Sequence, residues 1–139
     1  MKLPFDYLKQ RIGLISLLIF SLLLYVGCKK ESPIQTIGGS IHLNVLVKHH
    51  NRSLNAIPVY LKADANIFPG REPTLYDLKS QTDASGNANF SKLFPGNYYV
   101  YAYGWDPGVL DSVWGYKGIV LNNQTVINNE ITMGIAVTE

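Results

Sequence analysis

The feature that most constrains the fold is a strict alternation of side chains that begins near residue 40. Ile41, Leu43, Val45 and Val47 alternate with His42, Asn44, Leu46 and Lys48. Successive side chains of a strand point to opposite faces, so this pattern predicts a half-buried β-strand. Similar segments cover 57–62, 75–81, 87–93, 97–104, 113–121 and 124–133. Short strands separated by turn residues, with no sustained helical period, predict an all-β, seven-stranded antiparallel Greek-key β-sandwich over residues 40–139.

Three of the predicted connections carry turn residues. Asp83 and Gly86 occupy the first and fourth positions of a predicted turn, where glycine accepts a positive φ at little cost. Pro95 followed by Gly96 is typical of a type II turn, which needs a positive φ at the glycine. The pair Asn122-Asn123 predicts a hairpin between the last two strands, because asparagine tolerates the left-handed region.

The N-terminal segment predicts a signal peptide. Lys2, Lys9 and Arg11 precede an uncharged apolar run over residues 12–27, and Cys28, the single cysteine, follows it directly. Val26-Gly27-Cys28 resembles the cleavage site of a bacterial lipoprotein signal, in which the cysteine becomes the lipidated N-terminus. This predicts a signal peptide over 1–27 that forms a hydrophobic helix, a tether over 28–39 containing Pro33, and attachment to the membrane through Cys28.

Two alternatives to lipidation stay open. An uncleaved transmembrane anchor is one, although a run of 16 residues is just short of the roughly 17–25 that span a bilayer. A plain secretory signal is the other, and it would leave a lone thiol in an oxidising compartment. Tyr25 stands where lipoprotein signals usually have leucine. Lys29-Lys30-Glu31 resembles the tags that route some Gram-negative lipoproteins outward, so we expect a lipid-anchored envelope protein at the outer membrane.

Charge excludes some partners. Three of the 12 basic residues and one of the 10 acidic residues fall within 1–27, which leaves nine of each and a net charge near zero. A nucleic-acid partner would call for a basic face, so none is expected. A chain with no second cysteine has no disulfide and no thiolate metal site.

Three segments resemble a known family: residues 54–61, residues 82–90 (a T-D-x-x-G turn leading to Phe90) and residues 93–100 (L-x-P-G-x-Y-x-V). Together they resemble the carboxypeptidase regulatory-like domain, a prealbumin-like seven-stranded sandwich. The resemblance implies that Tyr98 is buried after the Pro-Gly turn. It implies little about function, because such domains are attached to many different proteins. The chain departs from the family at residues 64–78 and 104–112, where a function of its own is expected.

No catalytic or metal site is predicted. The chain lacks the G-x-S-x-G, H-E-x-x-H and Walker motifs. His42 and His50 are eight residues apart, about 26 Å along a strand, and His49 points to the opposite face from His50. We therefore expect surface histidines, no metal, no cofactor and no enzymatic activity.

The aromatic residues of the 97–104 strand and its neighbours are the best candidates for ligand binding. Tyr99, Tyr101 and Tyr103 lie on the parity opposite to Tyr98, which predicts an exposed row of rings. Trp105, Trp114 and Tyr116 follow close in sequence. Exposed rings suit a protein contact or sugar stacking, whereas rings paired across strands would only stabilise the sheet. The expected function is a membrane-anchored, non-enzymatic binding or scaffolding module at the bacterial envelope, or alternatively a glycan-binding accessory lipoprotein.

Overall fold

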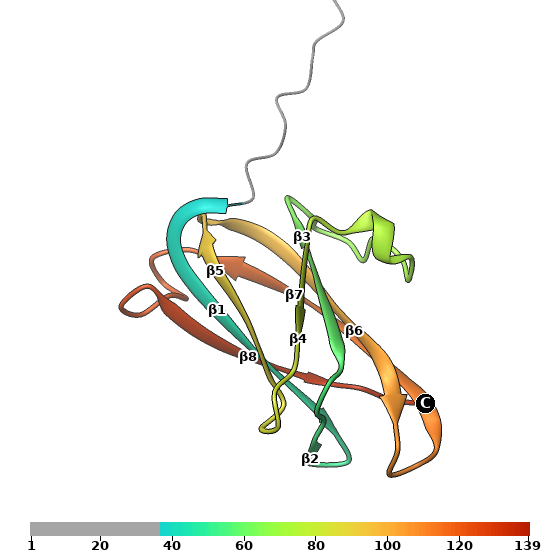
Figure 1. The fold of residues 1–139 in the computed structure, drawn as a ribbon. Coiled ribbons are helices and arrows are strands. Elements are labelled where there is room, and N and C mark those ends of the chain that lie inside the picture. Colours follow the sequence, from blue (N-terminus) through green and yellow to red (C-terminus); the bar gives the residue numbers. More distant parts are fainter. Residues whose placement is uncertain (1–36) are drawn as a thin grey trace, which may run out of the picture. The chain divides into compact units, whose positions relative to one another are not determined.

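The computed structural model describes residues 37–139, which form two β-sheets packed against each other (Figure 1). One sheet contains β1 (Ile37–His49), β2 (Arg52–Ser53), β5 (Asn87–Leu93) and β8 (Glu130–Ala136). The other contains β3 (Pro58–Ala63), β4 (Leu78–Gln81), β6 (Gly96–Asp106) and β7 (Asp111–Leu121), and a 3-10 turn, η1 (Pro73–Leu75), precedes β4. The predicted all-β two-sheet sandwich is confirmed, but residues 37–139 contain eight strands instead of the predicted seven, because the two-residue β2 pairs with β1 after the turn at His50 and Asn51. The predicted signal helix and Cys28 lie outside the described residues, and within 37–139 no helix could cross a membrane.

The core follows the alternation seen in the sequence. Leu43, Val45 and Val47 of β1 are fully buried, and they share one apolar cluster with Leu61 of β3 and Val100 of β6. Fully burying a valine or leucine stabilises the fold by about 1.5–3 kcal/mol relative to leaving it exposed. The opposite parity of β1 faces away from this cluster. The alternation of apolar and polar residues therefore determines which face of each long strand packs in the core between the two sheets.

The last strand differs from the prediction. β8 pairs with β1 in parallel, with Leu43 opposite Ile131 and Val47 opposite Ile135. No hairpin forms at Asn122-Asn123, because the Asn122 side chain accepts hydrogen bonds from the backbone N–H groups at positions 124 and 125 and β8 begins only at Glu130. The chain crosses to the other sheet, where it buries Ile135 in the core. The prediction of a wholly antiparallel sandwich is therefore wrong for this strand.

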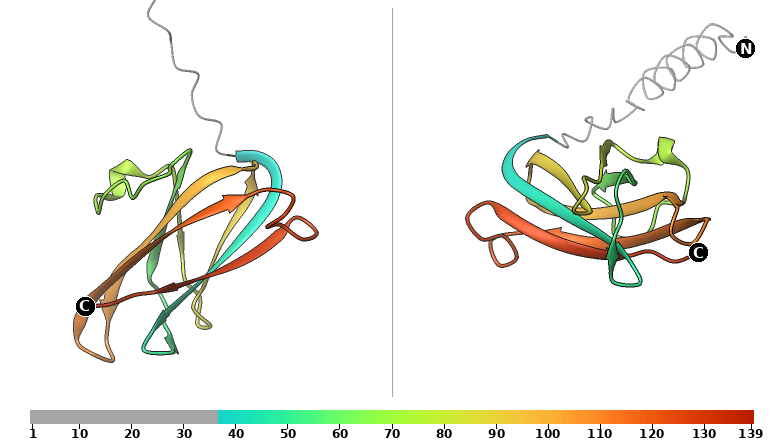
Figure 2. Two further views of the ribbon diagram at one scale, coloured as in Figure 1. Left: turned by 180° about the vertical axis from the view of Figure 1, so that it is seen from behind. Right: turned by 60° about the horizontal axis from the view of Figure 1, so that its bottom comes forward.

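The residues after β8 touch both sheets. The Val137 N–H donates to the Lys48 carbonyl over 2.9 Å, and Thr138 exchanges two backbone hydrogen bonds with Trp114 on β7. Figure 2 shows this segment reaching the β6–β7 pair from the β1 side. Glu139 is thereby placed beside the end of β1.

Two turn predictions have different outcomes. Asp83 Oδ1 accepts hydrogen bonds from the Ser85 and Asn87 N–H groups, and Gly86 has a φ of +82°, as predicted. Gly96 lies in β6 and is not among the described residues with positive φ, so the type II turn is wrong. The left-handed conformation in this connection is instead adopted by Lys92, four residues before Gly96, with a φ of +61°.

Tyr98 lies where the family resemblance placed it. Its side chain is 3% exposed, and its hydroxyl donates to the Phe94 carbonyl over 2.9 Å. The hydrogen bond satisfies the polar end of a ring that otherwise packs in the core. This confirms the predicted parity of β6, with Tyr98 inward and Tyr99 outward.

Candidate functional site

The outer face of the β4-β3-β6-β7 sheet carries a layer of aromatic rings, referred to below as the aromatic face. Its members come from β3, β6, β7 and the 64–78 connection: Tyr60, Phe68, Tyr76, Tyr99, Tyr101, Tyr103, Trp114 and Tyr116. Strand register brings them together, because Tyr101 lies opposite Tyr60 on one side and Tyr116 on the other. Tyr103 lies opposite Trp114 in the same way.

The 64–78 connection folds over this layer instead of leaving it open. Phe68 stacks on Tyr116 with ring centroids 4.1 Å apart and lies 5.7 Å from Tyr101. Tyr76 stacks on Tyr101 at 5.7 Å and its hydroxyl donates to the Gly70 carbonyl over 2.7 Å. Aromatic pairs of this kind add about 0.5–1.5 kcal/mol beyond their burial. The connection is therefore part of the packed structure.

Polar contacts hold the same connection at its far end. Asp77 Oδ2 accepts a hydrogen bond from the Ala63 N–H over 2.8 Å, and Asp77 Oδ1 pairs with Lys62 Nζ over 2.8 Å. The Arg71 guanidinium lies 3.6 Å from the ring centroid of Trp114, within cation–π range.

The predicted row of three exposed tyrosines is only partly present. Tyr101 is 2% exposed, and the expectation that it faces solvent is wrong because Phe68 and Tyr76 cover its ring. Tyr99 is half-buried beside Phe68, whereas Tyr103 remains 45% exposed. Burial raises the pKa of the Tyr101 hydroxyl above its ordinary value.

The other candidate residues also differ in exposure. Tyr116 is 45% exposed and Trp114 half-buried, and their rings stack at 6.0 Å. Trp105 is 56% exposed and lines a pocket with Pro107 and residues 52–56, apart from the other rings. The structure thus brings five of the six candidates together and places Trp105 near the end of the sandwich.

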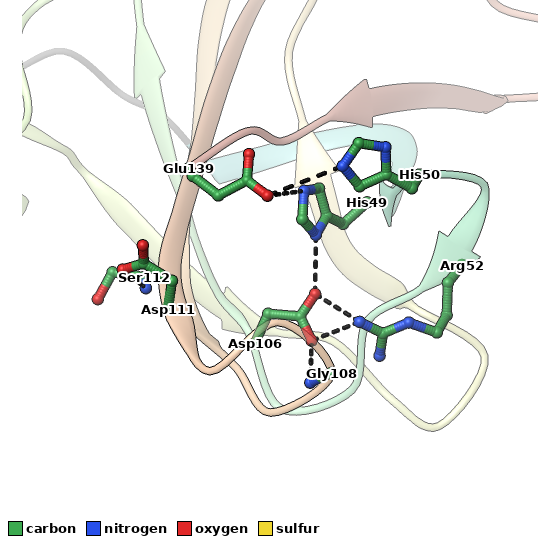
Figure 3. Close-up of polar contacts among 8 residues, drawn as sticks. All are labelled: His49, His50, Arg52, Asp106, Gly108, Asp111, Ser112 and Glu139. Atoms are coloured by element: carbon green, nitrogen blue, oxygen red, sulfur yellow. Dashed lines mark hydrogen bonds and ion pairs between the residues drawn. The ribbon is translucent and has the colours of Figure 1, made fainter.

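A second cluster lies at that end and was not predicted. Asp106 is fully buried, and Arg52 Nη2 contacts its two carboxylate oxygens over 2.5 and 2.6 Å (Figure 3). The Gly108 N–H donates to Asp106 Oδ1 over 2.8 Å, and His49 Nδ1 lies 2.9 Å from Oδ2. The hydrogen bond from Arg52, more than any other contact, holds the pKa of the Asp106 carboxyl well below its usual range.

His49 is 2% exposed, so the expectation that it is a surface histidine is wrong. The alternation of the strands explains the burial. His49 is the next inward-facing position of β1 after Val47, and Asp106 is the last inward-facing position of β6. The other ring nitrogen of His49, Nε2, is buried without a hydrogen-bond partner, 3.3 Å from Glu139 Oε1. His50 is exposed, and its Nε2 lies 3.8 Å from the same oxygen. The expectation that His49 and His50 point to opposite faces is therefore wrong, because β1 ends at His49 and His50 has a φ of +46°.

No protein-family model matches the chain, and no curated protein sequence does. Membership of the carboxypeptidase regulatory-like family therefore stays a prediction. Among solved structures, the fold is similar to a part of the Bacillus cereus major pilin subunit BcpA, with a TM-score of 0.49 and 9% identity. It is also similar to a part of the Corynebacterium diphtheriae major pilin SpaD, with a TM-score of 0.47 and 16% identity. The alignments cover 73% and 72% of this chain and 30% of each pilin.

A proposed carbohydrate binding protein of Pseudomonas aeruginosa aligns over 73% of this chain and 90% of its own length. Its TM-score is 0.45 and its identity 13%. Overlaps this weak carry no functional argument, so the function has to be argued from the geometry of this chain.

Proposed function

We propose that this chain is a non-catalytic binding module of the bacterial envelope, anchored through a lipidated Cys28 and contacting an envelope protein through the exposed part of its aromatic face. The observation that carries the proposal is that two tyrosines, each 45% exposed, flank Trp114: Tyr103 lies opposite it on β6, and Tyr116 stacks on it from β7. Protein contact surfaces are enriched in tyrosine, tryptophan and arginine. Rings held by their neighbours also lose little side-chain freedom on binding.

A protein partner suits this surface better than a polysaccharide does. Sugar stacking needs a free ring face, but Phe68 covers one face of Tyr116 and Arg71 covers one face of Trp114. The exposed side chains of this surface are those of Tyr103 and Tyr116, each with a hydroxyl, and the guanidinium of Arg71. These groups suit the mixed apolar and hydrogen-bonding contacts of a protein interface.

The surroundings of the His49–Asp106 pair support the proposed absence of catalysis. A catalytic dyad of this type would need a hydroxyl or thiol within hydrogen-bond reach of the second imidazole nitrogen. Among residues 37–139, His49 Nε2 has no hydrogen-bond partner, and its neighbour is the Glu139 carboxylate. The geometry therefore supports a structural or ligating histidine.

The exposed rings are expected to be needed for the partner and dispensable for folding. In native membranes solubilised in mild detergent, the wild-type chain should migrate as a complex larger than the chain alone. The double variant Tyr103→Ser/Tyr116→Ser should migrate as the free chain and should still unfold cooperatively, at a lower melting temperature because the stack of Phe68 on Tyr116 is lost. Ile127→Ser removes a side chain that is 74% exposed elsewhere, and this control should retain the complex. A complex retained by the double variant would contradict the proposal.

The same proposal predicts processing at Cys28. The intact mass of the mature protein should lack residues 1–27 and include an acyl modification, and Cys28→Ser should leave the precursor uncleaved. A wild-type mass that still contains residues 1–27 would favour the transmembrane anchor instead.

A further inference from the structure

The polar cluster at the end of β1 contains an arrangement that the proposed binding function does not use. One ligand atom from each of His49, His50 and Glu139 lies within 4.8 Å of the other two, and the Nε2 atoms of both histidines face Glu139 Oε1. From this geometry we propose that His49, His50 and Glu139 form a Zn²⁺ site, with a fourth coordination position open to water (Figure 3). Two imidazoles, one carboxylate and a water molecule are a ligand set that zinc is known to adopt, and the site is proposed here for binding zinc, with no reaction assigned to it.

The strongest support comes from His49. Asp106 is buried as a carboxylate, so the His49 Nδ1 that faces it over 2.9 Å has to carry the proton. In the neutral imidazole, Nε2 then presents a lone pair, and it is buried without a hydrogen-bond partner. A buried acceptor that faces the acceptor oxygen of Glu139 at 3.3 Å is unfavourable unless something positive lies between them.

The residues that contact His49 are arranged as they are around zinc-binding histidines. A histidine that binds zinc commonly donates its other N–H to a carboxylate, which fixes the tautomer and orients the ring. Asp106 does this for His49, and Arg52 and the Gly108 N–H in turn fix Asp106. Nε2 is therefore held in place, as a metal ligand needs to be.

Two of the three ligand–ligand distances are close to those around a tetrahedral ion, and the third, between His49 and His50, is at most 4.8 Å and shortens when the exposed His50 side chain moves. Ligand atoms about 2.0–2.2 Å from a tetrahedral Zn²⁺ are about 3.2–3.6 Å apart. The Glu139 oxygen lies 3.3 Å from His49 Nε2 and 3.8 Å from His50 Nε2. The side chains of His50 and Glu139 are 75% and 48% exposed, so both are free to adjust around the buried ligand.

A proton is the competing occupant. If His49 is an imidazolium, Nε2 donates to Glu139 and the cluster is a chain of ion pairs that needs no metal. The two accounts differ in stoichiometric zinc binding and in the role of His50, which is required only by the metal.

The test is a calorimetric titration of Zn²⁺ into the full chain in detergent, with Cys28→Ser in every sample so that no thiol contributes. We expect one Zn²⁺ per chain, a melting temperature that rises with Zn²⁺, and a tetrahedral visible spectrum when Co²⁺ replaces it. His50→Asn suits the φ of +46° at this position, so the turn is retained while a ligand is lost. Since loss of even an outer-shell partner costs 10–100-fold in metal affinity, both this variant and Glu139→Gln should bind zinc at least about tenfold more weakly.

His42→Asn removes the exposed third histidine and is the matched control, and its zinc affinity is expected to stay within about twofold of the parent, well below the 10–100-fold loss expected for a missing ligand. Absence of stoichiometric binding, or equal affinities for His50→Asn and the parent, would overturn the proposal. Equal losses in His42→Asn and His50→Asn would also overturn it, since binding would then be non-specific.

Discussion

Tyr101→Ala is expected to lower the free energy of unfolding by about 3–5 kcal/mol, the range for truncating a buried aromatic side chain. The ring is 2% exposed and contacts Tyr60, Phe68, Tyr76 and Tyr103. Its loss leaves a cavity beneath the 64–78 connection that the surrounding rings cannot fill without breaking their own contacts. Urea unfolding of the full chain, followed by tryptophan fluorescence, measures the change.

Tyr103→Ala is the matched control, two residues along the same face of β6. Its ring is 45% exposed, so the expected loss is below about 1.5 kcal/mol, in line with one aromatic pair. Equal losses in the two variants would mean that the connection does not cover Tyr101 in solution, and the division of the aromatic face into packed and exposed parts would be wrong.

Asp106→Asn is the second change with a large expected effect. Removing one partner of a buried ion pair costs about 3–5 kcal/mol, and we expect the lower end because Arg52 is 49% exposed and regains hydration. The control is Asp111→Asn. Asp111 is exposed, and its carboxylate accepts a hydrogen bond from the N–H of the next residue, Ser112 (Figure 3).

The same pair predicts the pH dependence of stability. The pKa of Asp106 is depressed in the folded state, so the unfolded chain takes up the proton first as pH falls. The stabilisation is therefore complete above the unfolded pKa of about 3.9 and is lost progressively below it. The difference in unfolding free energy between wild type and Asp106→Asn should be fully present at about pH 5 and should shrink as the pH falls below about 4. A difference that shrinks as pH rises would contradict this account.

Alternation along β1 and β6 predicted the core of the sandwich, because inward side chains have to be apolar whatever the partner strand is. It could also have placed His49 and Asp106 inside, since both continue inward series. His49 was predicted to lie at the surface because histidine is usually exposed, although its position in the alternation is an inward one. The path of β8 was not predictable in this way, because the alternation of a strand does not say which sheet it joins.

Coverage of Tyr101 could not be inferred either. Strand parity says which sheet face a residue occupies, and it gives no information about a loop that later packs on that face. Phe68 and Tyr76 lie within a connection of no regular period, so nothing in their spacing indicated that they would stack on β6 and β7. The aromatic composition of the connection was the one available signal.

The central claim, that the exposed part of the aromatic face contacts a protein, is tested most directly by photo-crosslinking in intact cells. A photoreactive phenylalanine analogue at Tyr103 should give one discrete adduct that protease removes, and the same analogue at Ile127 should give none. Mass spectrometry of the adduct should identify a peptide of an envelope protein joined at position 103. An adduct of equal yield at Ile127, or an adduct at Tyr103 that only glycan-degrading enzymes remove, would contradict the account.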